Sequence, residues 1–361
     1  MPKKSISSLE LTALINELQF LKKGKISQIY HQEKKELLFQ LHAPGKGKKL
    51  LKIVSGKFLC LTNTKDVPLR PSGFCMQLRK YLSNAFIKDL YQKNSERIIV
   101  FELEKQMKFF MIIELFSKGN LILTDEHKTI ITALERQIWK DRVIKPGEKY
   151  IFPKPGENWK ILTENKLSSI LKKSDKKNLA TSLATEVSLG GVYAEELCKI
   201  SNVDKNKLPK EVSSKEVTSM IKELKNILKL IQNPHGFVYS EQITPFRLSD
   251  QKLLKTTRTY NEAINTLNPF NIISPYEKRI KTLERTIDGQ KESITKLQQK
   301  IELNKQKGEL IYEKYTPLQK LLDIVKELKK SKDWKEIATE LKKEKKIKEV
   351  DLKNKKILID L

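Results

Sequence analysis

Apolar residues near the start of the chain recur at the spacing of an amphipathic helix. The residues that share this spacing are Leu11, Leu14, Ile15, Leu18 and Leu21. They lie three or four positions apart, which places them on one face of a helix. Ser7 or Ser8 can cap its N-terminus, and Gly24 ends it. Glu10 fits either a capping box or a first-turn acid that favours the helix dipole.

The pattern then changes to the alternation of strands. Four segments alternate apolar and polar residues, namely 26–30, 36–42, 50–54 and 58–62. Turns rich in Lys, Gly and Pro separate them, so we expect a meander of antiparallel strands. Further predicted elements are a helix over 73–82, strands over 97–103, 109–115 and 121–124, and a turn at 117–120. Pro-Gly pairs at 146–147 and 155–156 end this pattern, and we place the first domain at 1–158.

A helical pattern follows over 161–231, with polar loops at 174–177 and 204–211. Gly190 and Gly191 stand at its centre, immediately before a predicted helix. Two glycines there allow a tight turn with backbone N–H groups exposed at the helix N-terminus. The segment 236–247 is predicted to be extended, and we place the second domain at 159–270.

The third region, 271–361, begins with a long apolar seam from Tyr276. The seam residues are Ile280, Leu283, Ile287, Gln290, Ile294, Leu297, Ile301, Asn304, Gly308, Ile311 and Tyr315. They alternate in steps of three and four over about five heptads, which predicts a coiled-coil helix. Pro317 is expected to interrupt it, followed by a helix over 318–328, a short one from Asp333, and a hairpin over 347–361. The sequence holds no second long helix, so the seam is expected to pair with another chain or with a returning C-terminal half.

The charge balance indicates a polyanionic partner. Lys and Arg number 71 against 44 Asp and Glu, a formal net charge of +27. Such a surplus favours nucleic acid, because each neutralised phosphate releases condensed counterions. The sequence has three scattered cysteines and neither an apolar signal segment nor an uncharged span of membrane length. We therefore expect a cytoplasmic protein with no membrane partner.

Enzyme chemistry is weakly supported by the residues. The histidines and cysteines lack the spacing of metal ligands, so we expect no metal and no other cofactor. Pro2 could act as a Schiff-base nucleophile, and its position together with the Gly-Gly-x-Tyr-Ala-Glu-Glu segment is similar to formamidopyrimidine-type DNA glycosylases. Lys3 stands where that family has its catalytic glutamate, and the family's four-cysteine finger has no counterpart. A glycosylase or abasic-site lyase that uses Pro2 is thus the alternative, and our prediction is that the chain is not an enzyme.

Several segments in a fixed order resemble the NFACT proteins, the ribosome quality-control factors of the NEMF and RqcH type, also called the fibronectin-binding protein A domain. The segments that carry the resemblance are 6–10, 71–80, 96–98, 114–125 and 189–196, followed by the coil. The resemblance implies an α+β fold: a glycosylase-like antiparallel N-terminal domain, a helix–two-turn–helix domain, and a coiled-coil arm with a small tip. The C-terminal part of the family, with its returning helix, has no counterpart in this sequence.

The resemblance also implies a function and a set of site residues. The implied function is an adaptor that binds the large ribosomal subunit and its rRNA while the subunit holds a stalled peptidyl-tRNA. It would recruit tRNA of the alanine type for template-free C-terminal tailing, with no small-molecule substrate. The family's tRNA-linked residues fall on Glu10, Glu96 and Arg97, with both family aspartates replaced by glutamate. From the residues alone, Glu96 and Arg97 fit either a ligand-binding site or a surface ion pair.

Further residues in these segments are candidates for nucleic-acid contact. They are Arg79, Lys80, Lys118, Asn120, Gly190, Gly191 and Tyr193. A third interpretation is a structural or adhesive protein, and the high positive charge argues against it.

Overall fold

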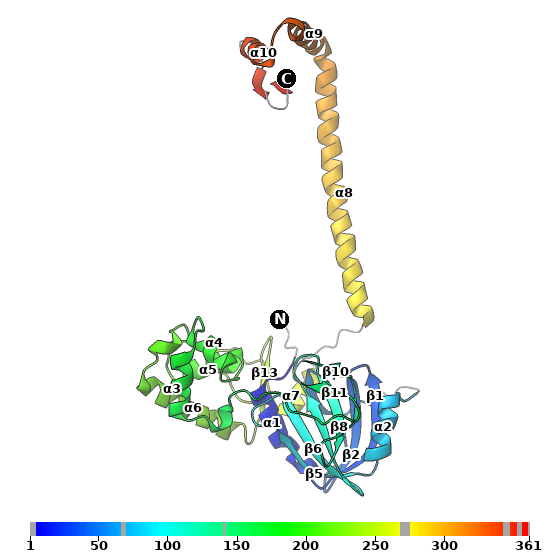
Figure 1. Ribbon diagram of the computed structural model, residues 1–361, viewed down its shortest axis with the longest axis vertical. Coiled ribbons are helices and arrows are strands. Elements are labelled where there is room, and N and C mark those ends of the chain that lie inside the picture. Colours follow the sequence, from blue (N-terminus) through cyan, green and yellow to red (C-terminus); the bar gives the residue numbers. More distant parts are fainter. Residues whose placement is uncertain are drawn as a thin grey trace. The chain divides into compact units, whose positions relative to one another are not determined.

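The computed structural model describes residues 5–65, 70–139, 142–267, 275–341, 347–351 and 356–359. The chain divides into two compact units, Met1–Asn271 and Ile272–Leu361. The first unit combines a large antiparallel sheet with helices, and the second is mainly helical (Figure 1). The predicted α+β class is therefore confirmed.

A nine-stranded sheet dominates the first unit, with the order β4-β3-β2-β1-β5-β6-β7-β8-β9. Its strands are β1 (Lys25–Glu33), β2 (Glu36–Ala43), β3 (Gly47–Val54), β4 (Phe58–Thr62), β5 (Phe86–Gln92), β6 (Ile98–Glu104), β7 (Lys108–Glu114), β8 (Asn120–Asp125) and β9 (Ile130–Ala133). Neighbouring strands are antiparallel, and β6 pairs with β7 in the register Ile98↔Glu114. The predicted meander is confirmed.

Two strands of this sheet, β5 and β9, were not predicted from the sequence. In β5 the buried residues are Ile87, Leu90 and Gln92, so the spacing is three and then two. A register shift between Ile87 and Asp89 causes this break in the alternation. A strand with such a bulge has no clear period-two pattern, which explains why it was missed.

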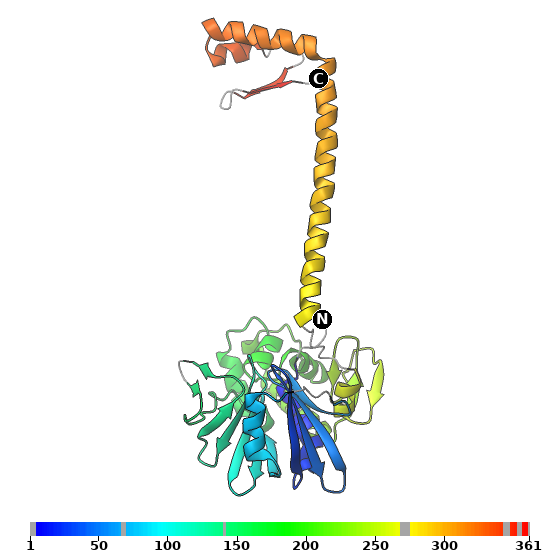
Figure 2. The ribbon, with the colours of Figure 1, turned by 90° about the vertical axis from the view of Figure 1, so that its right-hand side faces the viewer.

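The sheet curves strongly, so that α2 contacts two strands that are far apart in the strand order and two turns lie against each other. Helix α2 (Gly73–Leu82) contacts both the central strand β1 and the edge strand β9, and Figure 2 shows it in light blue lying along the strands. The turn after β3 also meets the turn after β7, where a side chain on Gly119 would lie 2.0 Å from the Gly56 backbone nitrogen. Only glycine permits this approach, which fixes the end of β7. The predicted bounds of α2 are confirmed.

Helix α1 (Ser8–Leu18) lies within the first unit with most of its surface buried. Ser7 caps it, and Glu10 closes the capping box, as the sequence predicted. A short 3₁₀ turn (Gln19–Leu21) continues it. The helix contacts β5 and also α7 (Tyr260–Leu267), which explains why apolar residues such as Leu9 and Ala13 are buried outside the predicted stripe.

The helical segment of the first unit has the predicted succession of helices. These are α3 (Glu164–Lys173), α4 (Leu179–Thr185), α5 (Gly191–Ile200) and α6 (Ser214–Leu230), with 3₁₀ turns at Trp159–Ile161 and Pro209–Glu211. Gly190 is the N-cap of α5 with a φ of 79°, a conformation that favours glycine. One small sheet precedes this segment, formed by β10 (Gln137–Ile138) with β11 (Val143–Ile144). Another follows it, formed by β12 (Gly236–Val238), β13 (Ile243–Thr244) and β14 (Lys255–Thr257).

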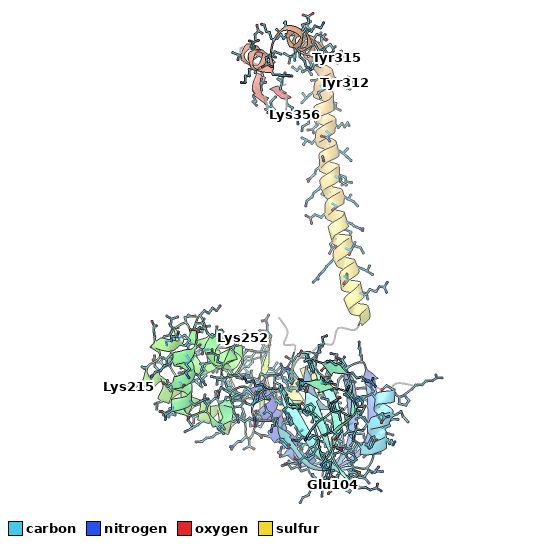
Figure 3. All side chains as sticks on the ribbon, viewed as in Figure 1. Glu104, Lys215, Lys252, Tyr312, Tyr315 and Lys356 are labelled. Atoms are coloured by element: carbon cyan, nitrogen blue, oxygen red, sulfur yellow. The ribbon has the colours of Figure 1, made fainter. Side chains whose placement is uncertain are left out.

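The second unit begins with the 39-residue helix α8 (Pro275–Glu313). Its side chains project into solvent, and apolar seam residues such as Ile287 and Leu297 are about half exposed (Figure 3). Helix α9 (Tyr315–Ser331) starts before Pro317, so the predicted interruption at Pro317 is wrong. Pro317 lies in the first turn of α9, where a missing N–H costs nothing, and the break falls at Lys314 instead.

A small core closes the second unit. Helix α10 (Trp334–Leu341) and the hairpin of β15 (Ile347–Asp351) and β16 (Lys356–Ile359) are both as predicted. Ile337, Ala338, Leu341 and Val350 form this core, and apolar residues of α9 pack against it. The pairing partner of the α8 seam stays a prediction.

Candidate functional site

Four segments of the first unit meet around an open cleft of about 410 Å³. They are the chain before and at the start of α1 (5–8), the turn before β6 (95–97), Phe116 after β7, and the connection from α4 to α5 (184–185 and 188–190). Serine and threonine residues make up much of the lining, and Arg97 is the one arginine among the described residues that line it. The cleft therefore joins the beginning of the chain to residues nearly two hundred positions later.

Glu10 lies beneath this cleft and is fully buried. Its Oε2 accepts a hydrogen bond of 2.8 Å from the Ser7 backbone N–H, and its Oε1 accepts the hydroxyl of Tyr193. The hydroxyl of Tyr260 is also buried near it, and burial together with the Glu10 charge raises the pKa of Tyr260 well above its ordinary value. A carboxylate in this position acts on the site through its neighbours and not by direct contact with a ligand.

Arg97 has an unusual guanidinium environment. Its Nε and Nη2 atoms are buried and have no hydrogen-bond partner among the residues that the structure describes. Burial lowers the pKa of Arg97, while the nearby charge of Glu10 opposes that shift. A buried donor without a partner costs about 1–3 kcal/mol. An anionic group that enters the cleft would relieve this cost.

Glu96 does not pair with its neighbour. Its Oε1 accepts a hydrogen bond of 2.7 Å from the Gly156 backbone N–H, and the described residues show no ion pair between Glu96 and Arg97. The surface ion pair that the sequence left open is therefore wrong. Glu96 instead ties the turn before β6 to the connection that leads to α3.

A group of buried polar residues supports the cleft from behind, and it was not predicted from the sequence. The Ser8 hydroxyl accepts a hydrogen bond of 3.0 Å from Trp159 Nε1. Gln92 Nε2 donates to the carbonyls of Ser8 and Glu96, and its Oε1 accepts from Lys160 Nζ at 2.8 Å. Burial lowers the pKa of Lys160 to about 8. Because β5 has a mixed sequence and was not predicted as a strand, Gln92 carried no signal that would have placed it at the site.

The predicted residues Gly190 and Tyr193 also belong to this site, whereas Gly191 does not. Gly190 lines the cleft, and Tyr193 lies below it in contact with Glu10. Gly191 lines a second, larger hollow of about 1060 Å³ between α5 and the segments 239–242 and 248–252. Tyr193 is almost completely buried, so any contribution to binding is indirect.

Arg79 and Lys80 lie on α2, away from the cleft lining. Arg79 Nε donates to the Ile29 carbonyl at 2.7 Å, and its guanidinium lies 5.5 Å from the Tyr30 ring centre. Lys80 is exposed beside Tyr81, with Nζ 5.5 Å from the ring. These two residues remain candidates for a separate contact with nucleic acid.

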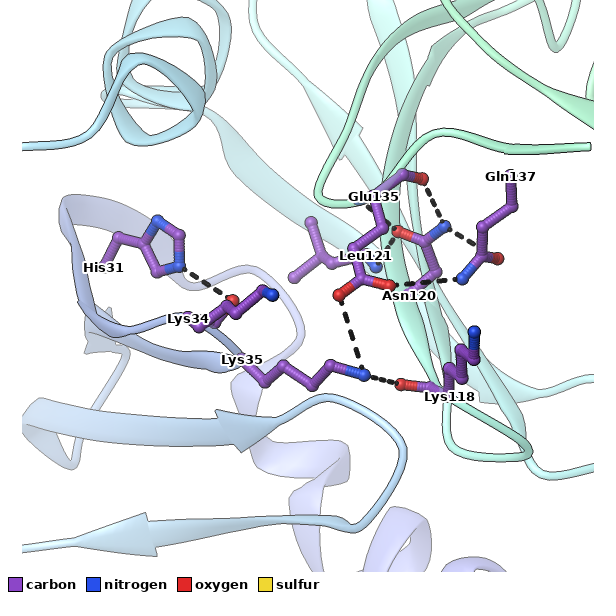
Figure 4. A network of polar contacts seen from close by, with 8 residues as sticks. All are labelled: His31, Lys34, Lys35, Lys118, Asn120, Leu121, Glu135 and Gln137. Atoms are coloured by element: carbon purple, nitrogen blue, oxygen red, sulfur yellow. Dashed lines mark hydrogen bonds and ion pairs between the residues drawn. The ribbon is translucent and has the colours of Figure 1, made fainter. Parts of the chain in front are cut away.

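Lys118 and Asn120 belong to a polar network at the start of β8 (Figure 4). Asn120 is fully buried, and its amide donates to the Glu135 carbonyl at 2.8 Å and to Gln137 Oε1 at 3.2 Å. Its Oδ1 accepts from the backbone of Leu121 and Glu135. The side chain of Asn120 thus serves the fold and is not placed to touch a ligand, whereas Lys118 is exposed.

A second buried glutamate, Glu114, lies near the cleft and is paired. Arg142 Nη1 and Nη2 donate to its two oxygens at 2.7 and 3.1 Å, and the Tyr150 hydroxyl adds a bond of 2.9 Å. The Arg142 guanidinium also lies 5.6 Å from the ring of Phe116, which lines the cleft. Burial and the Glu114 charge raise the pKa of Tyr150.

Other kinds of site find no support in the described part of the chain. No cluster of three or more potential metal ligands occurs there. None of the helices described could span a bilayer. Pro2 and Lys3, which bear on the glycosylase alternative, lie outside the described residues.

Comparison with known proteins gives relatives along nearly the whole chain. An archaeal Rqc2 homolog, aRqcH of Methanocaldococcus jannaschii, is 28% identical over 93% of this chain and 54% of its own length. The human ribosome quality control complex subunit NEMF is 23% identical over 93% of this chain and 35% of its own length. The chain therefore spans about half the length of the archaeal relative and less of the human one.

Solved structures support the fold of the first unit. The N-terminal part of the fibronectin/fibrinogen-binding protein from Streptococcus suis superposes with a TM-score of 0.60 at 20% identity, covering 74% of this chain and 100% of that one. The fibrinogen-binding protein from Staphylococcus aureus gives 0.61 at 18% identity, covering 72% and 98%. The family of NFACT N-terminal and middle domains matches residues 7–356. This chain belongs to the NFACT family, as its motifs predicted, and its relatives are ribosome quality-control factors by name.

Proposed function

We propose that this chain is a ribosome quality-control adaptor that holds tRNA through the Arg97 cleft. It would bind the rRNA of the large ribosomal subunit carrying a stalled peptidyl-tRNA, in the cytoplasm. It would recruit tRNA of the alanine type for template-free tailing, and the ribosome would form the peptide bonds. Family membership and the names of the relatives support the ribosomal part of this proposal.

The observation that carries the tRNA part is the state of the Arg97 guanidinium. Its buried Nε and Nη2 are strong donors without acceptors among the residues that the structure describes, and the side chain lines an open cleft. A phosphate group provides acceptors in the geometry that a guanidinium matches. The net charge of +27 brings a polyanion to the surface, and Arg97 would then bind one of its phosphates at a fixed place.

Binding of tRNA to single variants at one fixed salt concentration tests this proposal. Arg97→Ala is expected to weaken binding by about tenfold or more, since a charge-assisted contact is worth about 1.5–3 kcal/mol. Arg136→Ala removes an equally charged but exposed arginine and serves as the matched control. Equal affinity of the two variants would remove Arg97 from the tRNA site.

Co-sedimentation with free large subunits tests the ribosomal part separately. The protein is expected to pellet with isolated large subunits and to be released as salt is raised, because the contacts are with phosphates. Sequencing of the crosslinked RNA would identify the recruited tRNA. Recovery without any tRNA would contradict the recruitment role while leaving subunit binding intact.

A further inference from the structure

We propose that Tyr193 is a positioning residue that keeps Arg97 available to a ligand. By donating its hydroxyl to Glu10, Tyr193 holds that carboxylate in an orientation in which it does not take Arg97 into an ion pair. This inference rests on the proposed function for its consequence in RNA binding. It concerns a residue that lies beneath the cleft and does not touch the ligand itself.

The contacts of Glu10 show how its carboxylate is held. Oε2 faces the N-terminus of α1 through the Ser7 backbone N–H, and Oε1 faces α5 through the Tyr193 hydroxyl. A carboxylate can accept about four hydrogen bonds. Tyr193 therefore acts by fixing the direction of Oε1 and not by exhausting its capacity. The Tyr193 ring is itself packed, with its centre 5.6 Å from that of Phe246.

The Glu114 group shows what a buried glutamate does when an arginine reaches it. There Arg142 binds both carboxylate oxygens, and Tyr150 donates as a third partner. In the Glu10 group the contacts between described residues include a tyrosine hydroxyl on one oxygen and a backbone N–H on the other. The Glu10 charge acts on Arg97, since it opposes the lowering of the Arg97 pKa by burial. Two nitrogens of Arg97 nevertheless have no partner among the described residues.

Helix α7 completes the enclosure of Glu10, and its contacts with α1 help to fix the position of the Glu10 carboxylate. Glu17, two turns after Glu10 on the same face of α1, accepts the backbone N–H groups of Tyr260 and Asn261 at 2.6 and 2.9 Å. These bonds fix the start of α7 and bring the buried Tyr260 hydroxyl near Glu10. Three helices far apart in the sequence thus determine where the Glu10 carboxylate lies.

The test compares two tyrosine variants in the intact chain. Tyr193→Phe keeps the ring and removes the hydroxyl, so Glu10 can turn toward Arg97. The affinity for tRNA is expected to fall three- to tenfold. Tyr150→Phe removes an equally buried hydroxyl from the Glu114 carboxylate and should leave the affinity within twofold of wild type. The double variant Tyr193→Phe/Glu10→Gln should regain most of the loss, because a neutral amide does not attract the guanidinium.

A spectroscopic readout separates this inference from the proposed function. The Nε–Hε resonance of Arg97 should shift, and its exchange with solvent should slow, in Tyr193→Phe but not in Tyr150→Phe. If Arg97→Ala leaves tRNA affinity unchanged, the proposed tRNA site fails, and the resonance still decides the positioning role. If the resonance is the same in both tyrosine variants, or if Glu10→Gln restores nothing, the positioning role of Tyr193 is overturned.

Discussion

Two buried groups at the ends of the neighbouring strands β6 and β7 each combine a glutamate, an arginine and a tyrosine, and they use the arginine differently. Arg142 is bound through two nitrogens to Glu114, whereas Arg97 has two buried nitrogens without partners among the described residues. The groups are close in the fold, since Ile98 pairs with Glu114 and the Arg97 carbonyl accepts the Leu115 N–H at 2.8 Å. Composition and burial alone do not distinguish them.

The difference separates a contribution to stability from a capacity to bind. A buried arginine that is fully paired holds the fold together, and removing one partner leaves an uncompensated charge. A buried arginine without a partner lowers the stability of the protein, and a ligand that binds the arginine restores that stability. The same substitution is therefore expected to act differently at the two arginines. At Arg142 it should mainly lower stability, and at Arg97 it should mainly weaken binding.

The largest expected effect comes from removing each arginine. Arg142→Met should lower the free energy of unfolding by about 3–5 kcal/mol, because Glu114 would stay buried without its cation. Arg97→Met should change it by about 1 kcal/mol or less in either direction, since Nε and Nη2 lose no hydrogen bond to a described residue and a buried charge leaves the interior. Urea denaturation of both variants measures the two values. Equal losses would show that Arg97 is paired in solution.

A smaller effect is expected from pH, through the half-buried Glu17, whose carboxylate accepts backbone N–H groups and not an arginine. Burial raises the pKa of Glu17 from 4.5 to about 7. Between these values the folded state holds a proton that the unfolded state has released, so stability falls as pH rises from about 4.5 to 7. The expected loss is about 1–3 kcal/mol, taken below the full shift because Glu17 is partly exposed.

Denaturation at pH 5, 6 and 7.5 measures this loss, and Glu17→Gln is the control that should flatten the profile. Lys160 has a pKa of about 8, so its deprotonation makes stability rise with pH above that value. The measurements therefore stop at pH 7.5. A wild-type profile that rises between pH 5 and 7.5 would contradict the assignment. It would show that the two backbone bonds at α7 outweigh the burial of Glu17.

The smallest effect is expected where the Asn120 network, beside the Glu114 group in sequence, reaches the surface. Lys35 Nζ lies 3.6 Å from Glu135 and donates to the Lys118 carbonyl at the edge of the Asn120 network (Figure 4). Lys35→Ala should cost about 0.5 kcal/mol or less, because partly exposed ion pairs contribute little. Asn120→Ala, which leaves buried backbone groups without partners, should cost several times more. A large effect of Lys35→Ala would extend the cooperative network to the surface.

Local patterns in the sequence were sufficient for most elements. The capping residue and apolar spacing of α1, the bounds of α2 and the alternation of β2 and β6 all depend on residues a few positions apart. The motif order identified the family because each segment carries its own signal. The bulged strand β5 and the start of α9 were missed, because a register shift and a proline in a first turn disturb those local patterns.

What the sequence by itself determined is therefore the set of elements, the family and the choice of Glu10, Glu96 and Arg97 as residues of interest. Their hydrogen-bond partners and burial were decided only by the tertiary structure. The bond between Glu10 and Tyr193 joins residues 183 positions apart, and Glu96 turns to Gly156 instead of its neighbour. Hydrogen bonding and burial depend on which segments meet in space. For this reason the sequence did not show that two buried nitrogens of Arg97 have no partner among the described residues.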